Sequence, residues 1–251
     1  RVKADMEERE TIIDRPSPNH DARPDGIAID ILLLHYTGMH STEAALDRLT
    51  DPEARVSAHY LIDEDGRCYR MVDETRRAWH AGVASWQGAT NINARSIGIE
   101  LANPGHQFGY RPFGDHQMKC LENLCKVILR RYPIPAARVL AHSDVAPDRK
   151  EDPGELFDWE SLARNGIGIW PAESADAAEI MDLPEAMALL SEIGYAVPAD
   201  YTGPADTMTS QSTHSVFRAF QRRWMRRSPT GALTPETAAR IRSVHSKIFH
   251  S

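Results

Sequence analysis

The fold is decided by one apolar stretch near the start of the chain, Ala28-Ile29-Asp30-Ile31-Leu32-Leu33-Leu34-His35. Short apolar runs of this kind are typical of a strand that is buried in the core of an α/β protein. We therefore predict a buried strand that ends at His35. The run is far shorter than the roughly 18 apolar residues that a membrane-spanning helix needs, so we exclude an integral membrane protein.

Helices and strands alternate in the sequence that follows. Ser41 is placed to cap a short helix over residues 42–49. Asp65-Gly66 lies between two β-prone segments, residues 59–62 and 68–72, and this pair of residues is typical of a hairpin turn.

Three further segments complete the main domain. Residues 96–101 alternate between an apolar face and a face that carries Glu100. Residues 116–132 have helical spacing with Asp115 as the expected cap, and residues 139–142 form another short strand. Strands and helices that alternate around a hairpin predict an α/β fold with a mixed central β-sheet flanked by helices.

Charge divides the chain into two parts. The whole chain carries 29 Lys and Arg against 36 Asp and Glu, a formal net charge of −7. Residues 172–210 hold eight acidic residues and no Lys or Arg, whereas residues 211–251 hold eight basic residues and one acidic residue. This break predicts a domain boundary near Trp170-Pro171. We expect an extended arm over residues 1–27, a main domain over 28–171 and a smaller domain over 172–251.

Three helices are expected in the smaller domain. Pro184 can begin the first helix, and Gly194 closes it. The second covers residues 216–225, and Thr234-Pro235 begins the third with an N-cap followed by a proline at the first helical position. The fold class is therefore α/β with a small three-helix C-terminal domain.

The basic residues of the middle helix raise the question of nucleic-acid binding. They accompany the apolar residues Phe217, Phe220 and Trp224, and the acidic half of the region lies in the same small domain. We therefore favour a solvated basic face and expect no nucleic-acid partner. The arginines concerned are Arg218, Arg222, Arg223, Arg226 and Arg227.

Potential metal ligands stand at or just beyond the ends of predicted strands. His35 and His142 each end a strand, and Asp152 follows ten residues after His142. A catalytic zinc site needs three such protein ligands and an open fourth position, and strand ends hold ligand directions rigidly. Spacing alone leaves a packing or surface role open for each histidine.

Five stretches carry a resemblance to a known family over residues 28–171. They are Leu34-His35-Tyr36-Thr37, Ser57-Ala58-His59-Tyr60, Ala78-Trp79-His80-Ala81-Gly82, Ser96-Ile97-Gly98-Ile99-Glu100-Leu101 and residues 142–154, from His142-Ser143-Asp144 to Asp152-Pro153-Gly154. Together and in this order, they resemble the zinc-dependent N-acetylmuramoyl-L-alanine amidases. These type 2 amidases share a fold with peptidoglycan-recognition proteins.

The resemblance implies a site and a reaction. His35, His142 and Asp152 match the ligands of one zinc ion per chain, Glu100 matches the catalytic carboxylate, and Lys150 matches the lysine beside the metal. A zinc-activated water would hydrolyse the amide between the lactyl group of N-acetylmuramic acid and L-alanine of the peptidoglycan stem peptide, in cell-wall turnover.

The residues themselves agree with these roles. Glu100 lies opposite the apolar face of its strand, where a carboxylate can take a proton from a water whose pKa a metal has lowered. Lys150 and Asp152 project to the same side of an extended segment, which would bring an ammonium group near a developing oxyanion. Phage-type members have a tyrosine where this chain has Ala58, and a cysteine where it has Asp152.

Other residues near these motifs have two readings. His59 and His80 can contact substrate or serve as packing and hydrogen-bonding groups. Trp79, Trp86 and Asn91 lie in a loop that can form a cleft wall, where an aromatic ring either stacks on a sugar or anchors the loop. Asp144, Asp148 and Glu151 are expected to be solvated or turn-forming, and not ligands.

The smaller domain resembles the three-helix peptidoglycan-binding module. This resemblance implies a periplasmic protein that acts on polymeric wall or large muropeptides, and it allows an outer-membrane lipid anchor upstream of Arg1. The first ten residues are polar and lack a signal peptide, so a processed or trimmed chain is expected. We expect a monomer.

Two alternatives remain, a binding protein and a second kind of amidase. A recognition protein on the same fold would hold muropeptide without cutting it, but such relatives lose a zinc ligand. A cytosolic amidase that recycles anhydro-muropeptides shares the zinc motif and usually lacks the second domain.

Overall fold

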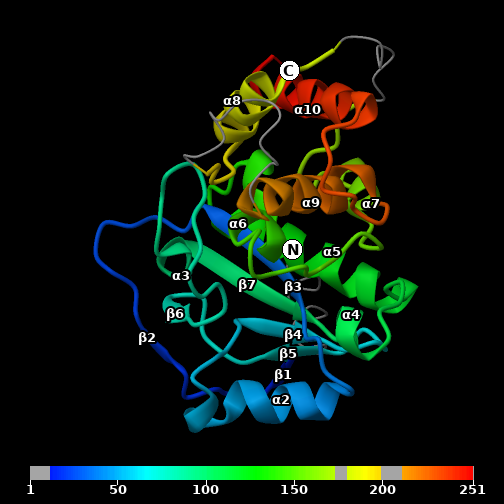
Figure 1. Ribbon diagram of the computed structural model, residues 1–251. Helices are drawn as coiled ribbons and strands as arrows, with labels where there is room; N and C mark the ends of the chain where they lie inside the picture. Colours follow the sequence, from blue (N-terminus) through cyan, green and yellow to red (C-terminus); the bar gives the residue numbers. More distant parts are fainter. Residues whose placement is uncertain (1–11, 173–179, 199–210, 251) are drawn as a thin grey trace. The chain divides into compact units, whose positions relative to one another are not determined.

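The computed structural model describes residues 12–172, 180–198 and 211–250 (Figure 1). Residues 1–11 of the expected arm and parts of the acidic segment therefore lie outside the described residues. The chain forms two compact units, one of Arg1–Gly82 with Asn93–Val139 and the other of Val83–Ile92 with Leu140–Ser251. Because the second unit joins residues before and after Trp170-Pro171, the units do not follow the expected boundary, and a separable domain over 172–251 stays a prediction.

A mixed six-stranded sheet has the order β1-β5-β4-β7-β3-β8. Strand β4 pairs antiparallel with β5 and parallel with β7, while β7 pairs parallel with β3 and β1 pairs parallel with β5. The mixed sheet and the hairpin are thus confirmed. The six strands are β1 (Ile12–Asp14), β5 (Cys68–Arg70), β4 (Tyr60–Ile62), β7 (Ser96–Leu101), β3 (Ile31–Tyr36) and β8 (Val139–Ala141).

Part of the expected arm is built into this fold. Strand β1 joins the sheet edge, and β2 (His20–Ala22) pairs antiparallel with β6 (Arg76–Ala78) as a second, two-stranded sheet. Between β1 and β2, the Ser17 hydroxyl donates to the carbonyl of Leu49 over 2.5 Å. Residues 12–22 are therefore held in the first unit by backbone hydrogen bonds of two strands and by a side-chain hydrogen bond.

The two central strands are buried along nearly their whole length. Residues 31–35 of β3 are all buried, as the apolar run predicts. In β7 the predicted polar face is also covered, since Gly98 is buried against the ring of His80. A Cβ at Gly98 would come within 2.5 Å of that ring, so this position has no room for a side chain.

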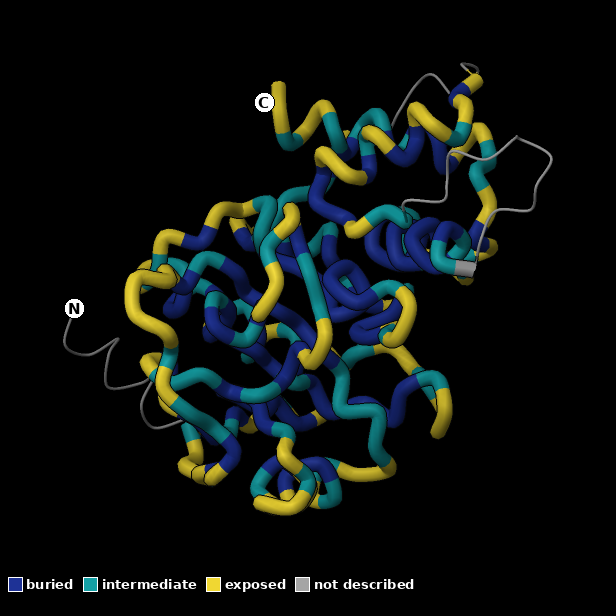
Figure 2. Tube along the Cα trace, turned by 60° about the vertical axis from the view of Figure 1, so that its left-hand side comes forward, coloured by how far each residue is buried: buried dark blue, intermediate teal, exposed yellow. Residues whose placement is uncertain are grey.

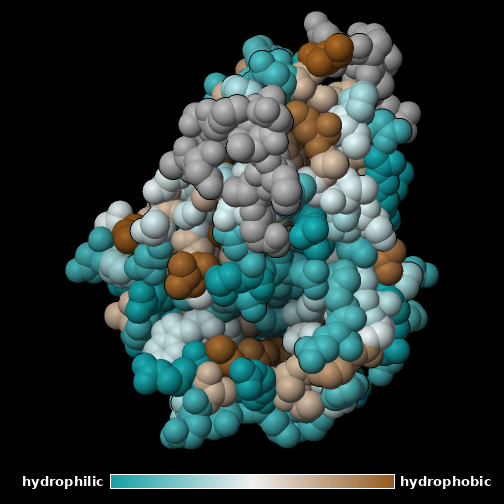
Figure 3. Space-filling view, viewed as in Figure 1, coloured by the Kyte–Doolittle hydropathy of each residue, from teal (hydrophilic) through white to brown (hydrophobic). Residues whose placement is uncertain are grey.

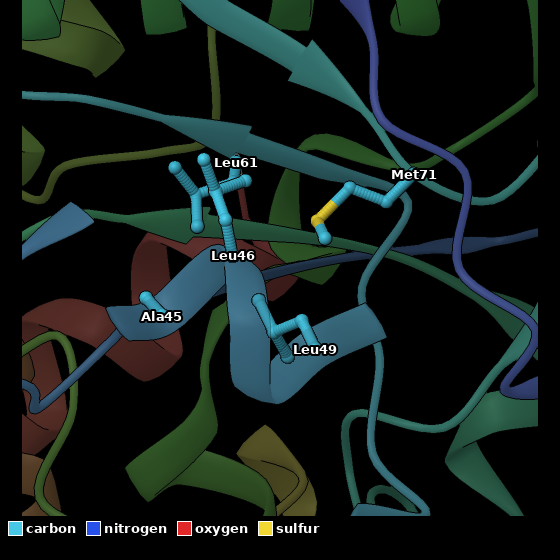
Figure 4. Packing of buried hydrophobic residues seen from close by; sticks show 5 residues of the cluster. All are labelled: Ala45, Leu46, Leu49, Leu61 and Met71. Carbon is cyan, nitrogen blue, oxygen red and sulfur yellow. The ribbon is translucent and has the colours of Figure 1, made fainter. Parts of the chain in front are cut away.

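Helix α2 (Thr42–Thr50) covers part of the sheet in the first unit. Its N-cap is Ser41, whose hydroxyl accepts from the amide of Ala44 at 3.1 Å, so the predicted cap is confirmed. The apolar side chains of α2 pack on β4 and the segment after β5 (Figure 4). This cluster consists of Ala45, Leu46, Leu49, Leu61 and Met71.

Helix α5 (Asp115–Arg131) is the long helix of the first unit. Gly114 occupies its N-cap and Asp115 its first helical turn, so the prediction that Asp115 caps the helix is wrong by one residue. A carboxylate in the first turn still interacts favourably with the helix dipole. The shorter helices of this unit are α3 (Ile92–Arg95), which begins at the boundary, α4 (Gly105–Phe108), η1 (Pro52–Ala54) and η2 (Ala136–Arg138).

Helices are the main elements in the described part of the second unit. Asp182 and Thr234 cap α8 and α10, and Gly194 ends α8, so the three predicted helices of the smaller domain are present, although the middle helix begins at Gln211 and not at residue 216. His142 begins a short helix directly after β8, whereas the sequence predicted that it would end the strand. The helices are α6 (His142–Val145), α7 (Trp159–Arg164), α8 (Leu183–Ile193), α9 (Gln211–Met225) and α10 (Pro235–Phe249).

Buried stretches of the chain alternate with exposed loops in both units (Figure 2). On the face shown in Figure 3, apolar residues form small separate groups among hydrophilic ones. Exposed large apolar side chains such as Ile13, Val83 and Phe249 come from different parts of the chain. Within the described ranges, no helix has the length and apolar character needed to cross a membrane.

Candidate metal centre and active site

Three predicted ligands come together in the structure. His35, His142 and Asp152 each offer one ligand atom, and these atoms all lie within 4.8 Å of one another. All three residues are buried. Nδ1 of His142 lies 3.0 Å from Oδ2 of Asp152, which confirms that the segment after α6 returns to the histidine.

The donor set suits zinc. Two imidazole nitrogens and one carboxylate oxygen are the ligand types that Zn²⁺ accepts, and catalytic zinc sites keep three protein ligands with a fourth position open. Burying several polar groups close together raises the free energy of the folded state unless each group has a partner. A bound cation would be a common partner for all three. The residues present therefore fit a single zinc ion.

Glu100 stands beside His35 in the sheet. The parallel register of β3 and β7 pairs His35 with Glu100, and side chains at paired positions of neighbouring strands project from the same face. On its other side, Glu100 pairs with Leu61 of β4. The register thus places the predicted catalytic carboxylate one strand away from a metal-ligand candidate, while its catalytic role stays a prediction.

His80 supports His35 from within the first unit. Nδ1 of His80 lies 3.0 Å from Nε2 of His35, and Nε2 of His80 lies 3.1 Å from Oγ of Ser96. The amide of His80 donates to Oδ1 of Asn93 at 3.1 Å. A hydrogen bond to one ring nitrogen of a metal-ligating histidine fixes its orientation and leaves the other nitrogen for the metal. The sequence pointed to His80 without a defined role and did not identify Ser96 or Asn93 as its partners.

His59 is a buried structural histidine. The amide of Gly98 donates to its Nδ1 at 3.0 Å, so the neutral ring carries its proton on Nε2, which lies 3.0 Å from the carbonyl oxygen of Arg76. Burial lowers the pKa of His59 to about 3, and the Arg23 guanidinium at 3.1 Å from Nε2 also disfavours the protonated ring. Of the two predicted readings, the structure favours the packing and hydrogen-bonding role.

The three loop residues Trp79, Trp86 and Asn91 differ in burial, and this separates the loop anchor from the candidates for a binding surface. Trp86 is buried, and its ring packs edge-on against Tyr195 with centroids 5.0 Å apart, so it anchors the loop. Gly194 approaches this ring so closely that a Cβ there would lie 2.3 Å from it. Trp79 is half-buried and Asn91 is exposed, so both remain candidates for a binding surface.

The segment between the second and third ligand candidates is tightly held. The amide of Ser143 donates to the carbonyl of Asp152 at 3.0 Å, and the amide of Lys150 donates to that of Ala146 at 3.0 Å. Lys150 is partly exposed, and its place beside an oxyanion stays a prediction. Asp148 and Glu151 are exposed as predicted.

Among the charged residues, one prediction holds and one is wrong. Asp144 is buried and accepts from the amide of Ala141 at 2.9 Å, so of the two expected roles, solvated or turn-forming, it has the second. Arg222 and Arg223 were assigned to a solvated basic face, yet both are buried. Acidic residues of the same unit compensate them, since Arg222 pairs with Glu151 at 2.8 Å and Arg223 with Asp144 at 3.7 Å.

Comparison with known proteins gives the same family as these residues. A family model described as N-acetylmuramoyl-L-alanine amidase matches residues 25–155. The Escherichia coli N-acetylmuramoyl-L-alanine amidase AmiD is 37% identical over 235 residues, which cover 84% of this chain and 80% of AmiD. The chain belongs to the N-acetylmuramoyl-L-alanine amidase family.

Solved structures of this amidase family extend the match to the second unit. A complex of E. coli AmiD with anhydro-N-acetylmuramic acid-L-Ala-D-γ-Glu-L-Lys superposes with a TM-score of 0.79 and 34% identity, covering 91% of this chain and 93% of AmiD. AmpDh3 from Pseudomonas aeruginosa also gives 0.79, with 30% identity over 91% of this chain and 96% of AmpDh3. The 1,6-anhydro-N-acetylmuramyl-L-alanine amidase AmpD of E. coli is 37% identical but covers only 57% of this chain and 86% of its own. The protein is therefore an amidohydrolase that acts on peptidoglycan-derived substrates, with the type 2 amidase fold.

The burial of His59 predicts a pH dependence of stability. Because the folded state keeps this ring neutral down to about pH 3 while an unfolded histidine takes up a proton near 6.5, stability is lost as the pH falls through this window. We expect the free energy of unfolding to fall by roughly 1 kcal/mol per pH unit more than in a His59→Asn variant, since one proton corresponds to about 1.4 kcal/mol per unit.

Urea unfolding at several pH values between about 4 and 6.5 measures this difference. His40 is exposed, and a His40→Asn variant measured in parallel is the matched control for the substitution itself. Equal pH slopes for the wild-type chain and His59→Asn would show that His59 takes up its proton at the same pH in the folded and unfolded states, against the lowered pKa.

Proposed function

We propose that this chain hydrolyses the amide between the lactyl group of N-acetylmuramic acid and L-alanine of a peptidoglycan stem peptide, with one zinc ion. The observation that carries the proposal is the convergence of His35, His142 and Asp152, with Glu100 paired to His35 across the sheet. The substrate in the complex of E. coli AmiD, an anhydro-N-acetylmuramic acid linked to L-Ala-D-γ-Glu-L-Lys, supports this choice of bond.

The proposed roles follow from the chemistry of each side chain. His35, His142 and Asp152 would hold the zinc ion, which when bound polarises a carbonyl and lowers the pKa of a water toward ~7. Glu100 takes a proton from the attacking water at its carboxylate and later returns it to the leaving amine nitrogen of L-alanine. The Lys150 ammonium faces the negative charge that develops on the amide oxygen.

The share of this chain that its relatives cover distinguishes it from the recycling amidases. AmiD and AmpDh3 match 91% of the chain in structure, whereas AmpD sequences match 57% of it. A protein that only binds muropeptide would have no need of a complete set of metal-ligand candidates, and this chain has all three. We therefore favour an enzyme of the two-domain type.

We further propose that residues 172–251 bind the cell wall, and that the protein acts as a monomer in the periplasm, with a lipid anchor upstream of Arg1. The resemblance to a peptidoglycan-binding module supports wall binding, since tethering raises the local enzyme concentration at a polymer. Sedimentation of the full chain with insoluble sacculi, compared with E. coli AmpD, measures this property. Equal pelleting of the two proteins would contradict it.

Removal of one proposed ligand should remove the metal. In a His142→Ala variant, only two ligands remain, so we expect less than one tenth of the zinc content of the wild-type chain and loss of turnover. Elemental analysis of the purified proteins and hydrolysis of anhydro-muropeptide check both quantities. The exposed His40 provides the control His40→Ala, which should keep its zinc. Full turnover by a metal-free His142→Ala protein would exclude the zinc site.

Removal of the proposed base should leave the metal in place. A Glu100→Gln variant keeps the shape of the side chain, so we expect normal zinc content and a kcat that falls by ~10²–10⁴-fold. Steady-state kinetics with metal analysis measure both quantities, and a near-normal kcat for Glu100→Gln would make Glu100 a structural residue.

Removal of the proposed oxyanion partner should act mainly on turnover. Lys150→Ala should lower kcat more than it raises KM, because the ammonium would act on charge that develops in the transition state. Steady-state kinetics measure both constants.

A further inference from the structure

Arg223 is a buried cation in the middle of the second unit. It lies in α9, and its side chain is 2% exposed. The guanidinium carbon lies 3.6 Å from the ring centroid of Trp159 and 4.0 Å from that of Trp224. An arginine held between two aromatic faces has a defined position, because the planar group stacks on both rings.

The anion that faces Arg223 is Asp144. Nε of Arg223 lies 3.7 Å from Oδ2 of Asp144, whose side chain is 1% exposed. The Tyr195 hydroxyl donates to Oδ1 over 2.6 Å, and the Ala141 amide donates to Oδ2 over 2.9 Å. Burial raises the pKa of Asp144, while the cation and the two donors around the carboxylate act against this shift. Tyr195 is fixed in turn, since Nε1 of Trp224 donates to its hydroxyl over 3.2 Å.

Asp144 belongs to the helix that carries a metal-ligand candidate. Helix α6 begins at His142, and the bond from Ala141 to Asp144 closes its first turn. The amide of Ser143 in this turn also donates to the carbonyl of Asp152. These two bonds hold the backbone on both sides of His142.

A second ion pair reaches the other end of this segment. Arg222, the neighbour of Arg223 in α9, donates to Oε1 of Glu151 at 2.8 Å. Glu151 directly precedes Asp152 in the chain. Through two consecutive arginines, helix α9 thus contacts Asp144, two residues after His142, and Glu151, directly before Asp152.

We propose that Arg223 is a positioning residue for the metal site: held between Trp159 and Trp224, it fixes Asp144, and Asp144 fixes the turn that presents His142. This inference rests on the proposed zinc site. It gives the region after residue 172 a function in the active site in addition to wall binding. The loss of Arg223 would leave a buried carboxylate without its cation, and the first turn of α6 would rearrange to bring that carboxylate to water.

The test uses the full chain and measures zinc affinity. Replacement of groups that support a metal ligand typically weakens metal binding by 10–100-fold. We expect Arg223→Met to raise the zinc dissociation constant about tenfold and to lower kcat, with Arg223→Lys intermediate because it keeps the charge without the stacked plane. Competition with a chelator of known affinity gives the constant, and circular dichroism confirms that each protein is folded.

Controls separate positioning from general stability. Arg227 is exposed near the end of α9, and Arg227→Met should keep the zinc affinity of the wild-type chain. If Arg223→Met does not fold, Tyr195→Phe removes only the hydroxyl from Oδ1 of Asp144 and should still weaken zinc binding. A folded Arg223→Met or Tyr195→Phe chain with wild-type zinc affinity and kcat, even at a lower melting temperature, overturns the proposal. A wild-type chain without zinc, or a His142→Ala variant that binds zinc normally, would instead overturn the zinc site.

Discussion

Strands β3 and β7 run parallel and in register from Ile31 and Ser96 to Tyr36 and Leu101, and this pairing sets His35 beside Glu100. The pairing requires two buried strands, because residues on both faces of β3 are covered. It also requires Gly98, since the ring of His80 occupies the space where a side chain would lie. The same ring bonds to His35. A buried parallel pair therefore brings together a metal-ligand candidate, its orienting histidine and the proposed base.

Burial of so many polar groups is tolerated because their partners are buried with them. His59 remains neutral between backbone groups, and Asp144 faces Arg223 and the Tyr195 hydroxyl. Burial lowers the pKa of Arg223 to about 10, which still leaves it charged at neutral pH. Removing one member of such a set lowers the stability of the folded state by more than a typical hydrogen bond contributes. The reason is that its former partner stays buried, without compensation, in a low-dielectric environment.

Local patterns in the sequence were sufficient for much of this fold and for the ligand candidates. The apolar run of β3, the hairpin turn at Asp65-Gly66 and the caps Ser41 and Thr234 each depend on a few neighbouring residues. The three-residue strands β1, β2 and β6 are too short to show a period, so their pairing could not be predicted. The burial of Arg222 and Arg223 was missed for a different reason: Glu151, the partner of Arg222, lies 71 residues earlier in the chain. An ion pair between residues far apart in the chain produces no pattern among neighbouring residues from which it could be predicted.

The proposed reaction is the cleavage of one particular amide bond by water. Incubation with anhydro-N-acetylmuramic acid-L-Ala-D-γ-Glu-L-Lys in water labelled with the heavy oxygen isotope, followed by mass spectrometry of the products, tests it most directly. We predict one labelled oxygen in the lactyl carboxylate of the sugar product and a released peptide with a free amino group on L-alanine. Label in a peptide carboxylate, or an unchanged substrate with the zinc-loaded protein, would contradict the claim.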